Sequence, residues 1–243
     1  MKTRITKLIM ALAVILPVAF TSCTDDYINA IEGTGEVIES ELVLDDFSGI
    51  ISAIAAQIYL TQGDEQEVWI EAQENIIDNI ELDVRNDVWV IEYKEFVRWA
   101  KPVKIYITVP DLKNVSITGS GSVTGLTEFT GLEHLDLTIS GSGHFDMETE
   151  SESLDVLISG AGGFDLSGQT EKFSILVSGS GSIDAEDLLT QEADVTISGS
   201  GNVYLDVRDY LNVLISGSGS VYYSGNPEIE SHISGSGTLR RNR

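Results

Sequence analysis

The chain has 243 residues, of which 39 are acidic and 14 basic, so its formal net charge at pH 7 is −25. This charge argues against nucleic acid as a partner and against electrostatic adhesion to anionic lipid, because both interactions need Lys and Arg. The hydrophobic fraction of 42% is too high for a disordered acidic tail, so we expect a folded chain.

The N-terminus has the pattern of an export signal. Its first residues carry three basic side chains, Lys2, Arg4 and Lys7. An apolar stretch over residues 8–20 follows, which is too short to span a bilayer comfortably, and Ser22 then precedes Cys23. This order resembles a bacterial lipoprotein signal, which implies that residues 1–22 are removed and that a diacylglycerol on the sulfur of Cys23 anchors the chain in a membrane. An ordinary secretory signal with an incidental cysteine is the alternative.

Residues 23–41 are expected to form an acidic tether. Removal of the signal takes away three basic residues and changes the net charge from −25 to −28. The Asp25-Asp26 pair after Cys23 resembles the signal that sends lipoproteins of Bacteroidetes to the outer face of the outer membrane, although a solvated tether is an equally open interpretation. We therefore expect a lipid anchor in the outer membrane, with the protein on the cell surface or on the periplasmic face. Cys23 is the only cysteine, so no internal disulfide can form.

The next part of the chain, residues 42–110, is predicted to be β-rich without a repeat. Apolar residues alternate with other residues over 54–60, 80–84, 88–90 and 103–109. Turns are expected at Gln62-Gly63-Asp64 and Arg85-Asn86-Asp87, and a short helical turn over Glu74 to Asn79. This half is either an early, degenerate part of a solenoid or a distinct β-layer that packs on one.

Residues 111–243 contain a strong internal repeat. An apolar residue, Ser or Thr, and then Gly-Ser-Gly or Gly-Ala-Gly occur seven times, 18 to 22 residues apart. The glycines of these pairs are Gly119, Gly121, Gly141, Gly143, Gly160, Gly162, Gly179, Gly181, Gly199, Gly201, Gly217, Gly219, Gly235 and Gly237. Apolar residues two apart flank each pair, so they share one face of a strand with both glycines, and the serines point outward.

This spacing predicts an all-β fold. A turn of about 19 residues cannot bury its own apolar face, whereas stacked turns bury a continuous core. Glycine at the corners permits a tight bend and a positive φ. We therefore predict a parallel β-helix or β-solenoid of about seven Gly-Ser-Gly repeats, running from about residue 103 to the C-terminus.

Carboxylates recur at fixed distances from the glycine pairs. Asp146, Asp165 and Asp184 each lie five residues after a first glycine. A second set, Asp136, Asp155 and Asp194, lies five residues before one. Stacked turns would bring each set into an outward column at about 4.8 Å spacing, where carboxylates repel one another unless a cation or solvent screens them. We expect no cofactor, and calcium with oxygen ligands is the candidate if the columns bind a cation.

The same columns could instead hold the acidic pair of a polysaccharide hydrolase or lyase. Such an enzyme usually adds basic residues, and residues 115–237 contain only Lys172 and Arg208, so we do not expect an enzyme.

Other outward residues form further candidate rows. The repeat serines Ser120, Ser142, Ser180, Ser200, Ser218 and Ser236 are either small turn residues or a hydroxyl strip that binds sugar. Leu157, Leu176 and Leu214 would form an outward stripe that we expect the N-terminal half to cover, with a binding surface as the alternative. The histidines His134, His144 and His232 lack the spacing of a zinc site and are expected on the surface.

Several segments together resemble the putative auto-transporter adhesin, head GIN domain family. They are Asp46-Phe47-Ser48-Gly49-Ile50, the run from Ile58 to Gly63, Glu74-Asn75-Ile76-Ile77, Val109-Pro110 and the Gly-Ser-Gly repeats. The resemblance covers residues 43–237. It implies a right-handed β-helix in a lipoprotein of Bacteroidetes and an adhesive role, and it supplies no catalytic residue or ligand.

From these patterns we expect a non-catalytic cell-envelope lipoprotein that acts as an adhesin, an interaction module or a scaffold. Its partner would be a protein or a glycan at the cell surface. The alternative is a carbohydrate-binding or carbohydrate-active β-helix, stabilised in either case by calcium if the aspartate columns bind it.

Overall fold

The computed structural model describes residues 30–242, which form a nearly all-β structure with one four-residue helix. The predicted signal peptide, the lipidation site Cys23 and the first part of the tether lie outside the described residues. Within residues 30–242, no helix has the length and apolar character needed to cross a membrane.

The elements fall into two groups. The first comprises β1 (Ile31–Glu32), β2 (Val37–Glu41), β3 (Gly49–Ser52), β4 (Ala56–Gln62), β5 (Glu67–Gln73), α1 (Glu74–Ile77), β6 (Val84–Arg85), β7 (Val88–Ile91), β8 (Val97–Trp99) and β9 (Val103–Val109). The second comprises β10 (Asn114–Gly119), β11 (Ser122–Gly125), β12 (Phe129–Gly141), β13 (His144–Gly160), β14 (Gly163–Gly179), β15 (Ser182–Gly199), β16 (Asn202–Gly217), β17 (Ser220–Gly225), β18 (Glu228–Gly235) and β19 (Thr238–Arg241).

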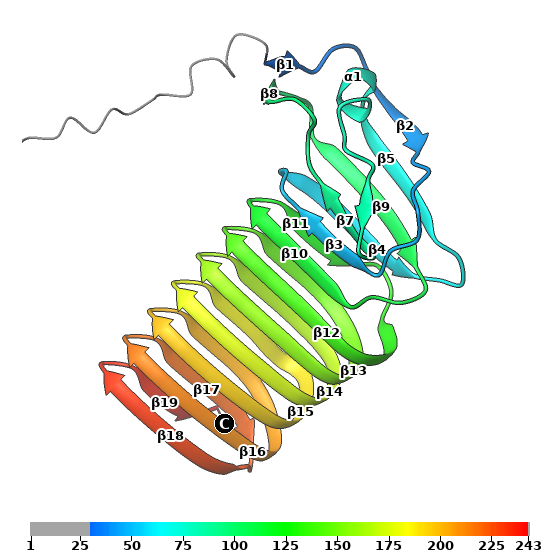
Figure 1. The fold of residues 1–243 in the computed structure, drawn as a ribbon. Helices are drawn as coiled ribbons and strands as arrows, with labels where there is room; N and C mark the ends of the chain where they lie inside the picture. The colour runs from blue at the N-terminus through cyan, green and yellow to red at the C-terminus, as the bar shows by residue number, and fades with distance from the viewer. Residues whose placement is uncertain (1–29, 243) are drawn as a thin grey trace, which may run out of the picture.

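The repeat region is a stack of parallel turns, as predicted (Figure 1). Each of the long strands β13, β14 and β15 starts at one glycine corner and runs to the next. The corners stay in register through the stack, with Gly141 beside Gly160 and Gly160 beside Gly179. The near-constant repeat length explains this register, because each turn hydrogen-bonds residue for residue to the turn before it.

The core of the solenoid consists of rows of apolar side chains, one from each turn. Along β13 the buried and exposed positions alternate, and the inward side chains include Phe145, Met147 and Val156. Phe145 stacks on Phe164 of the next turn with 4.8 Å between the ring centroids. Burial of such rows supplies the main stabilisation of a solenoid, because each turn covers its neighbour.

The two glycines of each pair have different roles, which the sequence pattern did not distinguish. Every first glycine has a φ between 116° and 141°, a range that L side chains rarely adopt. At Gly160 a Cβ atom would also strike the carbonyl oxygen of Gly141, which accepts a hydrogen bond of 2.8 Å from the Ala161 amide. At Gly162 a Cβ would point into the core, 2.6 Å from Cγ2 of Ile139. The prediction that both glycines face inward therefore holds for the second glycine only.

The solenoid begins earlier than residue 103, where the repeat pattern had placed its start. Strands β3 and β4 pair in parallel with β10 and β11 of the first repeat turn. They pair on their other side with β7 and β9, also in parallel. The N-terminal half therefore contributes two further turns that lack the Gly-Ser-Gly signature.

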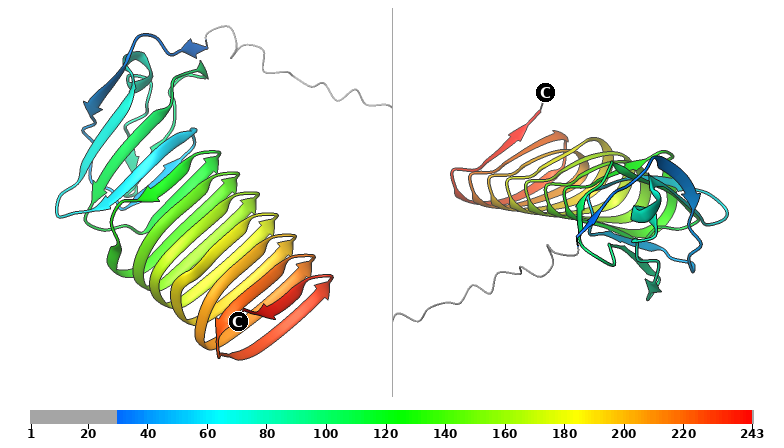
Figure 2. Two further views of the ribbon diagram at one scale, coloured as in Figure 1. Left: turned by 180° about the vertical axis from the view of Figure 1, so that it is seen from behind. Right: turned by 90° about the horizontal axis from the view of Figure 1, so that it is seen from above.

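Antiparallel strands close this end of the stack. Strand β5 pairs antiparallel with β9, and β2 pairs antiparallel with β5. Figures 1 and 2 show these strands and α1 at one end of the molecule, with the repeat turns extending away from them. One hydrophobic cluster runs through both parts, from Leu42 to Val221.

Candidate functional site

The outward face of the solenoid consists of straight rows, because every turn presents the same position to solvent. One row contains the predicted residues Asp146, Asp165 and Asp184, which are neighbours in register and exposed. The turns on either side contribute Thr124 and Tyr204 to the same row. The structure thus aligns the three predicted aspartates, and calcium binding by them stays a prediction.

The spacing of this row limits the way it can bind a cation. Successive turns of a parallel ladder lie about 4.8 Å apart, so Asp146 and Asp184 are separated by about twice that distance. An ion with ligands at about 2.4 Å can bridge two neighbouring carboxylates but not all three. Any calcium would therefore lie between adjacent turns.

The second predicted set is not a continuous column. Asp136 lies beside Asp155, but Ser174 occupies the next turn, between Asp155 and Asp194. Asp194 instead accepts a hydrogen bond of 2.9 Å from the side-chain amide of Asn212. The row is therefore partly relieved of like-charge repulsion, which the spacing of the aspartates alone did not reveal.

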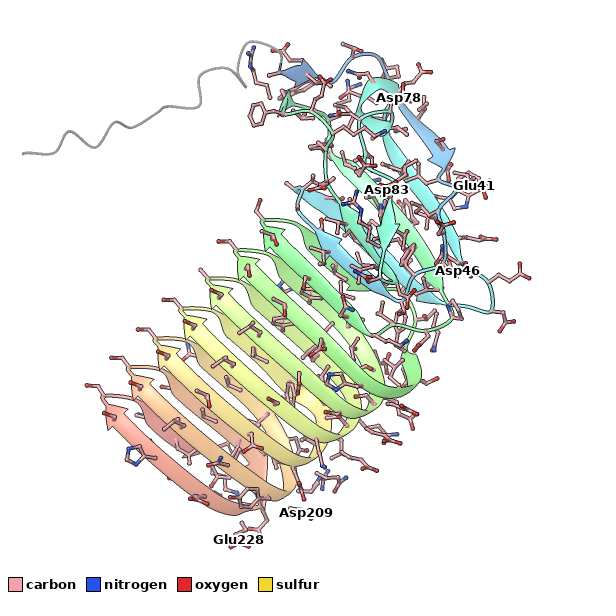
Figure 3. All side chains as sticks on the ribbon, viewed as in Figure 1. Glu41, Asp46, Asp78, Asp83, Asp209 and Glu228 are labelled. Carbon is pink, nitrogen blue, oxygen red and sulfur yellow. The ribbon has the colours of Figure 1, made fainter. Side chains whose placement is uncertain are left out.

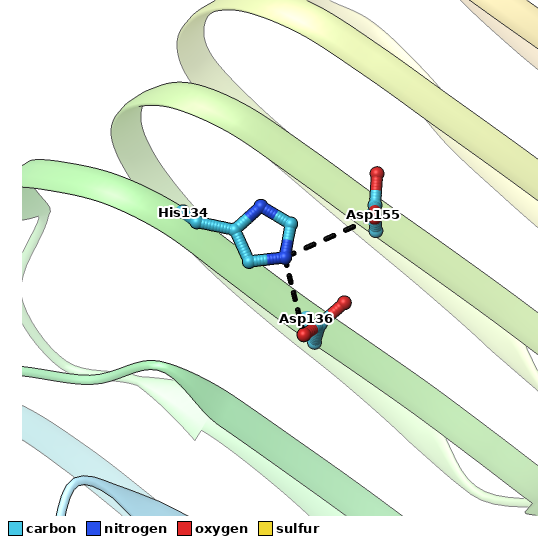
Figure 4. Close-up of side chains that lie close together, drawn as sticks. All are labelled: His134, Asp136 and Asp155. Atoms are coloured by element: carbon cyan, nitrogen blue, oxygen red, sulfur yellow. Dashed lines mark ion pairs between the residues drawn. The ribbon is translucent and has the colours of Figure 1, made fainter.

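His134 lies against the start of this second row (Figure 4). Its Nε2 is 3.1 Å from Oδ2 of Asp136 and 3.8 Å from Oδ2 of Asp155. Among residues 30–242, this is the group of three possible metal ligands whose ligand atoms converge. From its spacing in the sequence, His134 was predicted to be a surface residue outside any metal site. The missed signal was a His-x-Asp pair on the outward face with a further aspartate one repeat later.

The geometry at His134 favours an ion pair over catalysis. Both carboxylates approach the same nitrogen, Nε2. A nucleophile–histidine–carboxylate relay needs the two ring nitrogens to serve different partners, and Ser153, the neighbour of His134 in register, shares no hydrogen bond in the described contacts. Since about half of each side chain is exposed to solvent, the contact contributes little to stability.

A groove of about 610 Å³ follows the corner opposite the glycine pairs. Its rim carries five glutamates, Glu133, Glu150, Glu152, Glu171 and Glu192, together with Lys172. Its floor contains buried hydroxyls, and Ser151 donates a hydrogen bond of 3.1 Å to Oγ1 of Thr170. The groove would repel an acidic sugar, and Figure 3 shows Asp209 and Glu228 extending the acidic surface to the last turns.

The predicted leucine stripe is not covered. Leu157, Leu176 and Leu214 share one outward row with Thr138 and Thr196. Leu176 and Leu214 are each 43% exposed. The expectation that the N-terminal half packs over them is wrong, because that half stacks on the end of the solenoid and continues its ladders.

The remaining predicted surface residues are exposed. The repeat serines Ser120, Ser142, Ser180, Ser200, Ser218 and Ser236 all face solvent at the corners. His144 lies 3.4 Å from Oδ2 of Asp165, and His232 is exposed on the last long strand. A sugar-binding role for the serine strip stays a prediction.

Two aromatic pairs flank the aspartate row. Tyr59 stacks on Tyr106 at 4.9 Å and 15°, and Tyr204 stacks on Tyr222 at 4.8 Å and 8°. In each pair the ring faces cover one another, so they are not presented as a flat platform for a sugar ring. These tyrosines therefore favour a structural role in the ladder.

A charged network lies beside Tyr106. The Lys104 ammonium and the Tyr106 hydroxyl donate to the two oxygens of Glu71, at 2.8 and 3.0 Å. These hydrogen bonds lower the pKa of Glu71, and the bond to Glu71 raises the pKa of Lys104. Partial burial and the bond to Glu71 raise the pKa of Tyr106. All three groups stay in their ordinary charge states at neutral pH, so the network is structural.

The family model for the putative auto-transporter adhesin, head GIN domain, matches residues 46–227. The chain belongs to this family. The resemblance of the motifs is thereby confirmed, and the description of the family is that of a putative adhesin.

Solved structures agree with this assignment. The head GIN domain chain is 25% identical to a putative adhesin from Bacteroides fragilis, with a TM-score of 0.82 over 88% of this chain and 100% of that one. A putative lipid binding protein from Parabacteroides distasonis is 22% identical, with a TM-score of 0.72 and coverage of 88% and 100%. A putative adhesin from Parabacteroides merdae is 18% identical, with a TM-score of 0.72 and coverage of 88% and 99%. The last two show the fold alone. No curated protein sequence matches the chain.

Proposed function

We propose that this protein is a lipid-anchored adhesin of the bacterial cell envelope whose solenoid is a non-catalytic binding surface. The observation that carries the proposal is the set of outward rows: Ser140, Ser159, Ser178 and Ser198 lie in register in successive turns, and Asp146, Asp165 and Asp184 form a second row over three adjacent turns. Such rows provide many weak, repeated contacts along an extended surface. Membership of the head GIN domain family supports the same role.

The charge of the surface restricts the partner. Residues 115–237 carry 19 acidic side chains and two basic ones, Lys172 and Arg208. A surface of this kind repels nucleic acid and acidic glycans and favours a partner with a basic or neutral face. A protein of the host or of a neighbouring cell, or a neutral glycan, fits this requirement, and an envelope scaffold would use the same surface in the periplasm.

Anchoring through Cys23 completes the proposal. The signal-like order of residues before Cys23 supports acylation, and the aspartates after it support export to the outer face of the outer membrane. Protease treatment of intact cells, followed by immunodetection, tests the location. We expect the protein to be degraded while a periplasmic control survives; protection of the protein would overturn the adhesin and leave the scaffold.

Binding is tested with the purified mature protein and with a deletion strain. We expect the deletion to reduce attachment of cells to their host surface or to neighbouring cells, and complementation to restore it. A panel of polysaccharides incubated with the protein tests the alternative of a carbohydrate-active enzyme. Release of reducing ends or unsaturated products at many turnovers would contradict a non-catalytic surface.

Calcium binding is a second part of the proposal, supported by the in-register row of Asp146, Asp165 and Asp184. An ion between adjacent turns would screen their mutual repulsion and stabilise the stack. We expect calcium to raise the melting temperature and a chelator to reverse the rise. The Asp165→Asn variant should lose most of this response, whereas Asp64→Asn, a change outside the row, should keep it. A melting temperature that calcium leaves unchanged would contradict calcium binding by this row.

A further inference from the structure

A second groove, of about 840 Å³, lies at the N-terminal end of the solenoid. One wall is the arm that joins β7 to β9 and contains β8. The other wall is the β3–β4 corner over residues 53–57, with Ser120 and Ser122 of the first Gly-Ser-Gly corner beside it. None of the predicted site residues other than Ser120 lines this groove.

The arm exposes two large aromatic side chains. Phe96 is 50% exposed and Trp99 is 56% exposed, and these are the largest exposed fractions among the Phe, Tyr and Trp residues within residues 30–242. Both line the groove together with Tyr93. Exposed aromatic side chains of this kind are enriched where a protein meets the interface of a membrane.

The arm also differs from the rest of the chain in charge. Residues 92–104 contain four basic and two acidic side chains, in a protein whose net charge is −25. Arg98 pairs with Glu32 at 3.1 Å, and Lys101 pairs with Glu36 at 3.1 Å. The surface around the groove is therefore close to neutral, whereas the repeat turns are strongly acidic. A zwitterionic lipid surface, which carries no net charge, would accept this end and offers no electrostatic attraction to the acidic turns.

The arm is also where the chain arrives from the proposed anchor. Strand β1 pairs in parallel with β8, and the Ile31 amide donates to the carbonyl of Phe96 at 2.8 Å. The Gly33 amide donates to the carbonyl of Trp99 at 2.7 Å. Seven residues lie between Cys23 and Ile31, so the anchor can lie at most about 28 Å from Ile31, which pairs with β8 beside the groove. Figures 1 and 2 show β1 and β8 at the end of the molecule remote from the last turns.

We propose that the arm, together with β1 that pairs with it, rests on the membrane, with Trp99 and Phe96 inserted among zwitterionic lipid headgroups. This inference rests on the proposed anchoring through Cys23 and assigns the membrane-facing end of the molecule. Contact at this end directs the stacked turns away from the bilayer, so that their outward rows are accessible to a partner.

Quenching of tryptophan fluorescence by brominated lipid tests the contact. The chain has three tryptophans, of which Trp89 is fully buried and gives a constant background. Trp69 is 37% exposed on β5 and serves as the matched control. The full mature protein is reconstituted into phosphatidylcholine vesicles with bromine near the headgroup. We expect strong quenching in the Trp69→Phe variant and loss of the quenching in Trp99→Phe.

The outcomes separate the membrane from other occupants of the groove. Equal quenching of the two variants, or no quenching in either, overturns the inference. A Trp99 that is shielded from solvent but not quenched by the lipid also overturns it and identifies the tether as the occupant of the groove. The Phe96→Ala variant retains all three tryptophans and should also weaken quenching. An unchanged circular dichroism spectrum verifies that the variants fold.

The same material distinguishes failure of the contact from failure of the proposed function. The mass of the mature chain shows whether Cys23 carries an acyl group. If it does not, the anchoring fails, and the protein is added to preformed vesicles of the same composition. The membrane contact then survives only if Trp99 is still quenched.

Discussion

The repeat region and the N-terminal half build the same parallel ladder with different means. In the repeat region, identical glycine corners and rows of apolar side chains hold each turn in register. In the N-terminal half the turns lack those corners, and antiparallel strands, a short helix and side-chain networks such as Glu71–Lys104 hold the register. The repeat region therefore needs no specific polar contacts of this kind. Because the same corner recurs in each turn, it aligns every turn with the turn before it.

The largest expected effect comes from the aromatic row of the repeat region. Phe164→Ala removes a buried ring that stacks on Phe145, so it leaves a cavity between adjacent turns. We expect a loss of about 4 kcal/mol in the free energy of unfolding, measured by chemical denaturation. Leu176→Ala, on the exposed row of the same strand, should change it by less than about 0.5 kcal/mol. Similar losses for the two variants would contradict the inward–outward assignment.

A substitution at a glycine corner should follow in size. Gly160→Ala places a Cβ against the carbonyl oxygen of Gly141 at a φ of 136°. Strain of this kind costs about 1–3 kcal/mol of unfolding free energy. Ala161→Ser, between the two glycines, restores the residue of the other repeats and should be nearly neutral. If Gly160→Ala were also neutral, the corners would not be what distinguishes the repeat region from the N-terminal half.

The polar network of the N-terminal half should show itself through pH. Hydrogen bonds from Lys104 and Tyr106 lower the pKa of folded Glu71 below its ordinary value of 4.5. The stability gained from this group is therefore present above that value and is lost as the pH falls through the lowered pKa. Between about pH 5 and about pH 3, the wild type should lose more stability than Glu71→Gln, by less than about 1 kcal/mol because the pair is partly exposed.

The matched control for this measurement is Glu67→Gln, an exposed residue of the same strand. Denaturation curves at each pH give the comparison. A pH dependence that is the same in wild type and Glu71→Gln would show that the network contributes nothing to the register of β5 and β9.

The smallest expected effect concerns the row of like charges in the repeat region. In the absence of calcium, Asp146→Asn relieves repulsion with Asp165 in the neighbouring turn. We expect a gain of about 0.5 kcal/mol in the free energy of unfolding at low ionic strength, which 1 M salt should abolish. A loss of stability instead would mean that Asp146 makes a favourable contact that like-charge repulsion does not outweigh.

The extent to which the sequence predicted the site varied with the kind of contact. The row of Asp146, Asp165 and Asp184 was predictable, because a constant repeat length determines which residues become neighbours. The contact of His134 with Asp136 and Asp155 was missed, since a histidine that occurs in one repeat gives no periodic signal. The groove at Trp99 was missed for the same reason, as it joins segments with no common pattern.

The sequence by itself determined the parallel stack, its register and its inward rows, because period-two alternation and near-constant spacing admit one way to bury the apolar face. The tertiary structure alone decided that the N-terminal half extends and closes the stack rather than covering Leu176 and Leu214. It also decided that the two glycines of a corner have different roles, one permitting a positive φ and the other leaving room for the core. Both outcomes depend on contacts between residues far apart in the chain or in adjacent turns. A local sequence pattern does not determine the energy of such contacts.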